Sequence, residues 1–286
     1  MVPSSDRSKK LRALIGKGPV MMPGAFNALS ARMIERCGFD AMYLSGAVLA
    51  NSVGGVPDVG MMTLTEARDH AWHVAQSTDL PILMDADTGF GEGPYNIART
   101  VQELEHAGVS AIHIEDQVFP KRCGHLEGKQ LISVEAMCEK IATAVAAKAS
   151  PDFIVLARTD ARSVEGYDAA VRRANAYIEA GADGIFPEAL EEKSEFIRFA
   201  EDLDTILLAN MTEFGKTPYF TAREFRDMGY DLVIYPVTLQ RYAMKAIEAA
   251  LGVIKEEGTQ KSLVDDMQTR AELYELLDYD MDVPGK

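Results

Sequence analysis

Short runs of apolar residues alternate along this chain with longer segments in which apolar residues recur at helical spacing. Most of these runs are apolar at nearly every position, which is typical of strands that are buried on both faces. They predict eight strands: Val20–Gly24, Ala41–Ser45, Pro81–Asp85, Ala111–Glu115, Phe153–Arg158, Gly184–Glu188, Ile206–Asn210 and Leu232–Pro236.

The segments between the strands have apolar residues three or four positions apart and predict helices. Glycine follows several of them, as at Gly38, Gly108 and Gly181, and glycine is favoured just past a helix C-terminus. The predicted helices are Lys9–Ile15, Phe26–Cys37, Leu64–Gln76, Tyr95–Ala107, Val134–Ala149, Asp168–Ala180, Lys193–Asp202, Ala222–Met228, Leu239–Glu257 and Leu263–Leu277.

Eight strand–helix units in succession indicate an α/β fold of the (β/α)8 TIM-barrel type. The sequence has no Gly-x-Gly-x-x-Gly fingerprint or Walker loop to support an open nucleotide-binding sheet. We therefore expect one barrel domain over residues 1–286, with an N-terminal helical segment (1–18) and C-terminal helices (239–286). The apolar residues of the last predicted helix need a partner surface, which either the chain's own barrel or a second subunit can provide.

The net charge of −15, from 29 Lys and Arg against 44 Asp and Glu, argues against nucleic-acid or membrane partners. The three cysteines have no disulfide-framework spacing, which indicates reduced thiols. The first residues lack the apolar core of a signal peptide, and no stretch is long and apolar enough to span a membrane. We therefore expect a cytoplasmic protein, in which an anionic substrate would need local cations.

Polar residues stand at the C-terminal ends of the predicted strands, which is the active-site face of a TIM barrel. Six strands end in such residues: Ser45-Gly46, Asp85-Ala86-Asp87, Glu115-Asp116, Arg158-Thr159-Asp160, Glu188 and Asn210. Loop residues are polar in any barrel, but acids and an arginine so consistently at the last strand position favour a functional site.

Asp85 and Asp87 are two positions apart, so on an extended strand their carboxylates would point the same way. Together with Asp58 and Glu115 they would repel one another, and some would protonate unless a cation neutralised them. Oxygen ligands of this kind suit Mg²⁺. The alternative for Asp87 alone is a helix cap or a turn.

The stretch Lys121-Arg122-Cys123-Gly124-His125 places a thiol among cations. Nearby cations are expected to lower the thiol pKa of Cys123, which would suit either a nucleophile or a proton-transfer group. A Cys-x-His zinc site is less favoured, because no second ligand pair has zinc spacing. Cys37 and Cys138, on helical segments, are interpreted as inert thiols.

Arg158 ends a buried strand, where an unpaired guanidinium would be costly. Arg241 and Arg270 lie on the C-terminal helices, where a solvated surface arginine is the ordinary interpretation. A polycarboxylate substrate would use such guanidinium groups for bidentate contacts.

These motifs resemble the isocitrate lyase / phosphoenolpyruvate mutase superfamily, and within it most closely the 2-methylisocitrate lyases. The resemblance covers nearly the whole chain. It rests on Tyr43-Leu44-Ser45-Gly46, Asp85-Ala86-Asp87-Thr88-Gly89-Phe90-Gly91, Ile114-Glu115-Asp116-Gln117, the Lys121–His125 stretch, Ala157-Arg158-Thr159-Asp160-Ala161, Phe186-Pro187-Glu188, Ala209-Asn210-Met211-Thr212-Glu213-Phe214-Gly215 and Met267-Gln268-Thr269-Arg270.

The resemblance implies retro-aldol cleavage of (2S,3R)-2-methylisocitrate to pyruvate and succinate, a step of the methylcitrate cycle in propionate catabolism. It also implies Mg²⁺, for which Mn²⁺ can substitute, and a homotetramer built from dimers that exchange their last helix. Asp85 and Asp87 match metal-site positions, Cys123 matches the catalytic acid, and Tyr43 is a candidate base. The matching substrate positions are Ser45, Gly46, Ala47, Cys123, Gly124, His125, Arg158, Glu188, Asn210, Met211, Thr212, Arg241 and Arg270.

One departure concerns Leu126-Glu127-Gly128, where many bacterial 2-methylisocitrate lyases have Arg-Pro-Asn. Two alternatives within the superfamily are cleavage of 2,3-dimethylmalate and hydrolysis of a 2-oxo-dicarboxylate such as oxaloacetate. A non-catalytic scaffold is disfavoured, because the aspartate pair, Cys123 and Arg158 are all present.

Overall fold

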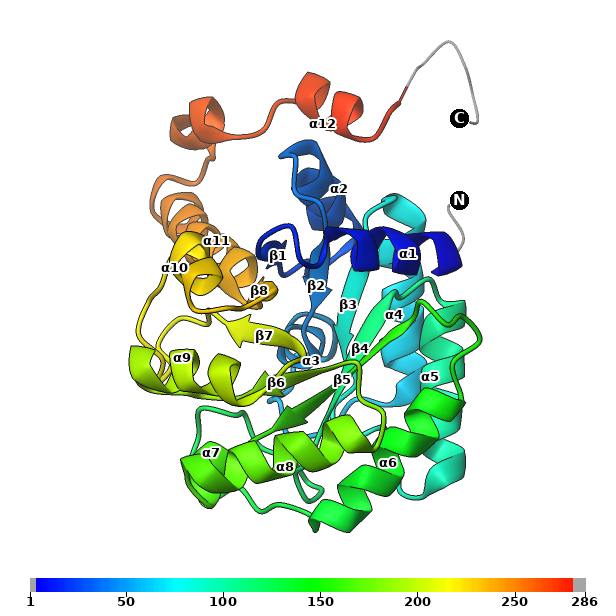
Figure 1. The fold of residues 1–286 in the computed structure, drawn as a ribbon. Helices are drawn as coiled ribbons and strands as arrows, with labels where there is room; N and C mark the ends of the chain where they lie inside the picture. Colours follow the sequence, from blue (N-terminus) through cyan, green and yellow to red (C-terminus); the bar gives the residue numbers. More distant parts are fainter. Residues whose placement is uncertain (1–3, 280–286) are drawn as a thin grey trace.

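The computed structural model describes residues 4–279 and contains eight parallel strands in the order β1-β8-β7-β6-β5-β4-β3-β2 (Figure 1). A bridge between Gly24 and Tyr43 joins β1 to β2 and closes the barrel. A side chain at Gly24 would collide with the carbonyl of Pro236, so glycine permits this closure. The strands are β1 (Val20–Pro23), β2 (Met42–Leu44), β3 (Ile82–Asp85), β4 (Ala111–Glu115), β5 (Ile154–Thr159), β6 (Gly184–Pro187), β7 (Ile206–Asn210) and β8 (Leu232–Tyr235).

Helices follow the strands around the barrel, which confirms the predicted (β/α)8 fold with C-terminal helices. They are α1 (Ser4–Leu14), α2 (Ala28–Arg36), α3 (Gly46–Leu49), the π-helix η1 (Ala50–Gly54), α4 (Leu64–Ser77), α5 (Pro94–His106), α6 (Val134–Ala146), α7 (Ala161–Val164), α8 (Tyr167–Glu179), α9 (Lys193–Asp202), α10 (Ala222–Asp227), α11 (Thr238–Glu257), the 3-10 helix η2 (Lys261–Asp266) and α12 (Arg270–Leu276). The sequence analysis did not anticipate α3, η1 or α7.

The two ends of the chain differ from the predicted helices for identifiable reasons. Helix α1 begins before the predicted Lys9 because buried Arg7 anchors its first turns, donating to the carbonyls of Ala75 and Thr78 at 2.7 and 2.6 Å. The predicted helix Leu263–Leu277 is divided, because Thr269 and Glu272 form a capping box that starts α12 at Arg270. Residues 1–3 and 280–286 of the predicted terminal segments lie outside the described residues.

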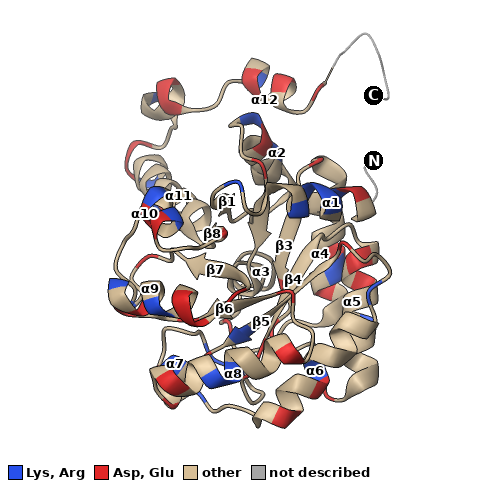
Figure 2. Cartoon of the chain, in the orientation of Figure 1, with Lys and Arg blue, Asp and Glu red and all other residues tan. Residues whose placement is uncertain are grey.

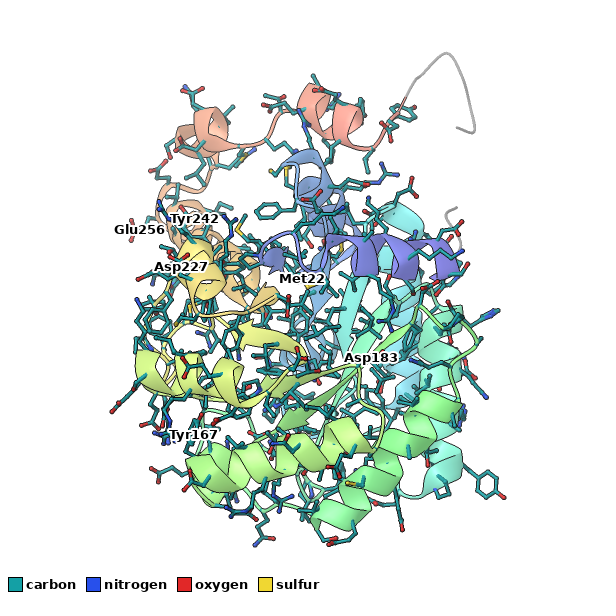
Figure 3. The ribbon with its side chains drawn as sticks, viewed as in Figure 1. Met22, Tyr167, Asp183, Asp227, Tyr242 and Glu256 are labelled. Carbon is teal, nitrogen blue, oxygen red and sulfur yellow. The ribbon has the colours of Figure 1, made fainter. Side chains whose placement is uncertain are left out.

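Two apolar layers hold the barrel together. Met22, Leu83, Leu156 and other inward-facing strand residues fill the barrel interior, and Figure 3 labels Met22 on β1. The outward-facing residues pack against the surrounding helices in a larger cluster. This alternation fixes which side chains point into the barrel and which point outward.

Helix α11 does not pack on the barrel as the other long helices do, for none of its residues is buried. Tyr242 and Leu251 are 81% and 59% exposed, and Met21 on β1 is 43% exposed. Helix α12 instead packs on α2, where Arg32 donates to the carbonyl of Leu276 at 3.1 Å. Among residues 4–279, α11 (Figure 1) contacts the outer apolar cluster through Leu239 in its first turn, but no residue of the helix is buried.

Acidic residues occur on many of the outer helices, including α2, α6, α9 and α12, with no single positively charged face (Figure 2). Within residues 4–279, no helix combines the length and apolarity needed to cross a bilayer.

Candidate active site

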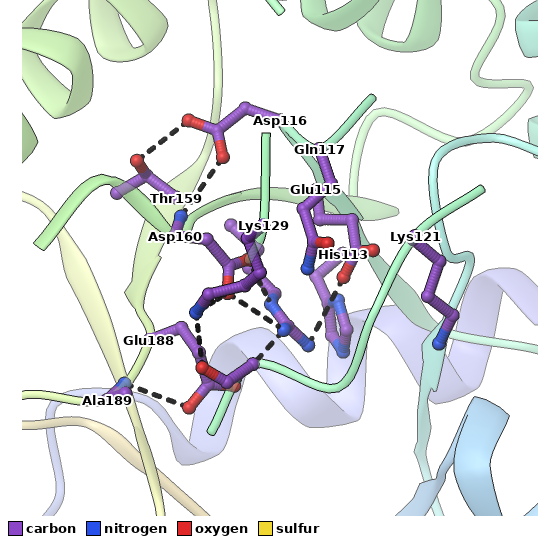
Figure 4. A network of polar contacts seen from close by, with 12 residues as sticks. His113, Glu115, Asp116, Gln117, Lys121, Lys129, Thr159, Asp160, Glu188 and Ala189 are labelled. Atoms are coloured by element: carbon purple, nitrogen blue, oxygen red, sulfur yellow. Dashed lines mark hydrogen bonds and ion pairs between the residues drawn. The ribbon is translucent and has the colours of Figure 1, made fainter. Parts of the chain in front are cut away.

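Arg158 pairs with acids in a buried charge cluster at the C-terminal ends of β4, β5 and β6, and Figure 4 labels these acids as Glu115, Asp160 and Glu188. Its guanidinium is 3.3 Å from Glu115 Oε2, 3.0 Å from Asp160 Oδ2 and 3.4 Å from Glu188 Oε2. Burial alone would raise the pKa of Glu188, but Arg158 and His125 outweigh it and hold that pKa well below its ordinary value. The arginine that ends the buried strand therefore pairs with three carboxylates.

The carboxylates of Asp85 and Asp87 lie close together, as expected, and both approach the backbone of Gly46. The extended strand that was expected to bring them together is not present at Asp87. Strand β3 ends at Asp85, and Asp87 has a left-handed backbone with φ 48° instead of an extended one. A Cβ built on Gly46 would lie 2.9 Å from both Asp85 Oδ2 and Asp87 Oδ1. Aspartate tolerates this conformation better than most residues, and such conformations concentrate at functional sites. The strand-periodicity argument was therefore wrong at Asp87.

The acids of this cluster differ in their pKa shifts, because burial disfavours the charge of Asp85 but His113, Lys121 and Arg158 outweigh it and lower the pKa of that carboxyl. Burial and the nearby charge of Asp85 raise the pKa of Asp87 to about 6, even though Lys121 opposes the shift. Burial also raises the pKa of Glu115 well above its ordinary value. Burial is the largest cause of both increases and repulsion between the acids is a smaller one, so these shifts agree only in part with the repulsion expected from the sequence.

The same oxygens suit a hydrated divalent cation. Glu115 Oε1 is buried without a polar partner, whereas Asp87 Oδ1 and Glu115 Oε2 accept no hydrogen bond of good geometry and have only the ion-pair contacts to Lys121 and Arg158. Across the described residues, no three His, Cys, Asp or Glu side chains form a ready-made metal cage. One or two carboxylates plus retained waters is the usual way in which proteins hold Mg²⁺, so the donor set fits that ion without such a cage.

Lys121 is the cation that lies among these acids in the structure. Its buried ammonium is 2.5 Å from Asp58 Oδ1 and 2.8 Å from Asp87 Oδ1. It connects the loop after β4 to the loop after β2, which carries Asp58. The sequence analysis treated Lys121 only as a neighbour of Cys123 and missed this contact.

The loop that carries Cys123 is folded down onto the Arg158 cluster. A side chain at Gly124 would overlap with Glu188 and Arg158, so the loop backbone lies directly against both. His125 Nε2 is 3.1 Å from Glu188 Oε1, and its Nδ1 accepts from the Lys216 backbone N–H at 3.1 Å. The structure thus brings Cys123, Gly124 and His125 to the strand ends.

The thiol of Cys123 differs from the sequence-based expectation. Burial is the largest influence on its pKa and raises it above the ordinary value, and the Glu188 carboxylate acts in the same direction. Arg158 lowers the pKa but does not compensate. The prediction of a lowered pKa was wrong, because burial of the thiol outweighs the effect of the nearby cations. A neutral thiol is a proton donor, and it is a poor nucleophile.

Tyr43 and His113 form a buried pair inside the barrel, with Tyr43 Oη 2.7 Å from His113 Nε2. Burial lowers the pKa of His113 to about 4, so the imidazole is neutral at pH 7. Burial and the charge of Asp85 raise the pKa of Tyr43 well above its ordinary value. His113 Nδ1 is 3.7 Å from Asp85 Oδ1, so the Tyr43–His113 pair lies close to this carboxylate.

The remaining predicted residues fall at the rim or away from the cluster. Ser45 caps α3 and Ala47 lines a cavity of about 970 Å³ beside α11. Asn210 Nδ2 is 3.4 Å from both carboxylate oxygens of Glu188, and it is followed by buried Met211 and half-buried Thr212.

The two C-terminal arginines are not brought into the cluster by this chain. Arg241 borders the same cavity, with its side chain 45% exposed, and it donates to the carbonyl of Glu213 at 2.7 Å. Arg270 is exposed at the start of α12. Helix α12 contacts the last turns of α2, which lie at the opposite end of the barrel from the strand C-termini.

Several site residues were missed by sequence reasoning. They are His113, Gln117, Lys121, Lys129 and Asp160. Polar side chains in or next to an apolar strand were the available signal for His113 and Asp160. Gln117 and Lys129 had no such signal, because Gln117 binds the backbone of Arg122, and Lys129 binds the Gly124 carbonyl and the Asp160 carboxylate along a loop path that the sequence does not show.

Comparison with known proteins agrees with this arrangement. A family profile described as phosphoenolpyruvate phosphomutase matches residues 11–255. A probable 2-methylisocitrate lyase of Corynebacterium glutamicum is 54% identical over 91% of this chain and 85% of its own length. The 2-methylisocitrate lyase of Aeropyrum pernix is 52% identical over 94% of this chain and 86% of its own length.

Solved structures agree in fold at lower identity. A 2,3-dimethylmalate lyase is 36% identical with a TM-score of 0.89, covering 97% of this chain and 92% of its own. An oxaloacetate acetylhydrolase is 34% identical with a TM-score of 0.90, covering 96% and 94%. A phosphonopyruvate hydrolase in complex with oxalate and Mg²⁺ is 30% identical with a TM-score of 0.85, covering 94% of each chain. The chain therefore belongs to the isocitrate lyase / phosphoenolpyruvate mutase superfamily, as a member of its 2-methylisocitrate lyase family of carbon–carbon lyases.

Proposed function

We propose that this enzyme cleaves (2S,3R)-2-methylisocitrate to pyruvate and succinate with Mg²⁺, as a step in propionate catabolism. The observation that carries the proposal is the position of Cys123 and Gly124, folded onto Arg158 and Glu188 next to the carboxylates of Asp85 and Asp87. An acid, a guanidinium and a hard-cation site in one buried place are the groups that cleavage of a hydroxy polycarboxylate requires.

The carboxylates would hold the metal. Asp85 and Asp87 are the main donors, with Glu115 and Asp58 acting directly or through water. When bound, Mg²⁺ or Mn²⁺ polarises the substrate's hydroxyl and carboxylate oxygens and lowers the energy of negative charge on them. The Mg²⁺ in the related phosphonopyruvate hydrolase complex supports this assignment.

The protein side chains would bind the substrate carboxylates and move two protons. Arg158 and Asn210 present donors at the strand ends, and the backbone of Ser45, Gly46 and Ala47 would face the oxo-acid end. Loss of the C2 hydroxyl proton lets its electron pair form the pyruvate carbonyl as the C2–C3 bond breaks. The electrons of that bond remain on C3, delocalised into the adjacent carboxylate, and the Cys123 Sγ–H protonates C3 to give succinate.

The raised pKa of Cys123 supports this division of roles, because the thiol retains its proton until the carbanion forms. Tyr43 is the proposed base for the C2 hydroxyl. Since its pKa is raised, it would act through the neutral His113 to which it is hydrogen-bonded, and not as a standing phenolate. Closure of the Cys123 loop would exclude water from the carbanion.

The proposed assembly is a cytoplasmic homotetramer in which neighbouring subunits exchange their C-terminal helices. Helix α11 has no buried residue, and Met21 lies uncovered on the outside of β1. An exchanged helix would cover such surfaces and bring Arg270 of one subunit close to the site of another. Arg241, which borders the cavity beside α11, would then lie near the same substrate carboxylate.

The alternatives share the fold, so the fold alone does not separate them. The 2,3-dimethylmalate lyase and the oxaloacetate acetylhydrolase are 36% and 34% identical, against 54% for the first 2-methylisocitrate lyase described above. This difference in identity favours the tricarboxylate substrate.

A coupled assay of pyruvate release tests the proposal. We expect EDTA-sensitive turnover of 2-methylisocitrate that exceeds turnover of isocitrate and 2,3-dimethylmalate, and recovery on addition of Mg²⁺. Oxaloacetate should release no acetate. Strong preference for dimethylmalate, or full activity with EDTA, would overturn the substrate or the metal assignment.

A further inference from the structure

Lys129 stands at the returning end of the Cys123 loop, and neither the mechanism nor the sequence motifs assign it a role. We propose that Lys129 is a positioning residue that latches this loop closed over the active site. Its ammonium donates to the carbonyl of Gly124 and lies 2.7 Å from Asp160 Oδ1 (Figure 4). The side chains of Lys129 and Asp160 are 1% and 0% exposed, so this contact is part of the protein interior.

Between Lys129 and Cys123, His125 is the side chain that attaches the loop to the rest of the protein, through Glu188 Oε1 at 3.1 Å and the Lys216 backbone N–H at 3.1 Å. Leu126, Glu127 and Gly128 are exposed, and Leu126 is 59% exposed. At the other end of the loop, the Gln117 side chain holds Arg122 by two backbone hydrogen bonds of 2.9 Å. Cys123 and Gly124 lie between these two attachments, so the position of the thiol depends on both.

The partner of Lys129 is itself rigid. The Asp160 backbone N–H donates to buried Asp116 at 3.0 Å, and Asp116 also accepts from Thr159 Oγ1 at 2.7 Å. The carboxylate of Asp160 therefore has a fixed place at the end of β5. Lys129 therefore attaches a surface loop, which is generally a mobile element, to a fixed carboxylate at the end of β5.

Asp160 also binds the substrate-facing arginine, because its Oδ2 lies 3.0 Å from Arg158 Nε. One carboxylate thus holds the loop through Lys129 and orients Arg158 at the same time. Loss of the ammonium leaves the Gly124 carbonyl without its donor, and leaves Arg158 as the only cation on Asp160 among the contacts of the described residues. Closure of the loop and orientation of Arg158 are therefore coupled.

The test replaces Lys129 by methionine, which keeps an unbranched apolar side chain and removes the charge. Lys148→Met is the matched control. Lys148 also pairs with a partly buried aspartate, Asp183, at 3.1 Å, but this pair lies at the opposite end of the barrel from the active site. The first measurement is the rate at which iodoacetamide alkylates Cys123, followed by mass spectrometry of its peptide. The second is kcat and KM for 2-methylisocitrate, and the third is the melting temperature.

We expect Lys129→Met to increase the alkylation rate about tenfold, the equivalent of one charge-assisted hydrogen bond, with a similar fall in kcat. Lys148→Met should change neither the alkylation rate nor kcat. An unchanged alkylation rate in a folded Lys129→Met protein would overturn the latch. Increased alkylation of Cys123 and of Cys138 together would also overturn it, because it would indicate general loosening.

The activity readout rests on the proposed function, but the alkylation readout does not. If the wild-type enzyme does not cleave 2-methylisocitrate, the proposed function fails while alkylation still reports on the latch. If the wild type cleaves it and Lys129→Met alkylates as the wild type does, the latch alone fails.

Discussion

Arg158 and Arg241 were both predicted to bind the same kind of substrate, and the structure places them in opposite environments. The side chain of Arg158 is 9% exposed at the end of a central strand and pairs with three carboxylates. That of Arg241 is 45% exposed on a helix with no buried residue. The barrel brings the first set of predicted site residues together within one chain, whereas the described residues of one chain do not bring the predicted C-terminal arginines to that cluster.

The largest predicted effect is at Arg158. Arg158→Met leaves Glu115, Asp160 and Glu188 buried without their shared cation, so we expect about 3–5 kcal/mol less free energy of unfolding. Turnover should fall by about 10³-fold or more, because donors to the substrate carboxylates are lost. Urea unfolding and the pyruvate assay measure both.

The matched variant for this comparison is Arg241→Met, for which the expected change in unfolding free energy is within about 0.5 kcal/mol because the side chain is half exposed. Equal destabilisation by the two variants would contradict the contrast between the two arginines.

Cys123→Ser is expected to lower kcat by about 10²–10⁴-fold, the usual contribution of a general acid. The fold should not change, because Cys123 lies on a loop, and the affinity for Mg²⁺ should not change, because its thiol is not among the proposed metal donors. Circular dichroism, metal titration by calorimetry and turnover test this. Cys138→Ser is the control, and near-normal turnover of the Cys123 variant would remove the thiol from the mechanism.

The exposed face of α11 can be tested with Leu251→Glu. Because Leu251 is 59% exposed in the single chain, the variant should change subunit stability by only about 0.5 kcal/mol or less, yet dissociate the proposed tetramer. Light scattering measures the mass in solution, and Glu256→Gln on the same helix is the control. A wild-type mass for Leu251→Glu would argue that α11 makes no subunit contact.

The smallest effect is a pH dependence. Since burial raises the pKa of Cys123, the thiol is neutral at pH 7, and the thiolate fraction grows about tenfold per pH unit until pH exceeds the raised pKa. Alkylation of the wild-type enzyme should therefore keep increasing beyond pH 9 without a plateau. A plateau of the alkylation rate near pH 7 would instead support the lowered thiol pKa that the sequence suggested for Cys123.

Much of the fold followed from the sequence. Continuous apolar runs such as Ala111–Glu115 specify strands buried on both faces, and the helical segments between them require a parallel sheet. Because parallel strands all end on the same face of a barrel, Asp85, Glu115, Arg158 and Glu188 were expected to gather, and they do. These features depend on local periodicity and topology, which the sequence contains.

Only the tertiary structure decided how the charges pair and which side chains complete the site. The left-handed turn at Asp87, the contact of Lys121 with Asp58 and the reach of Lys129 to Asp160 join residues on different loops. The thiol pKa of Cys123 is raised and not lowered because the folded loop buries the thiol, and sequence spacing does not reveal that burial. Loop paths and burial set these energies, and both arise from packing across the whole barrel.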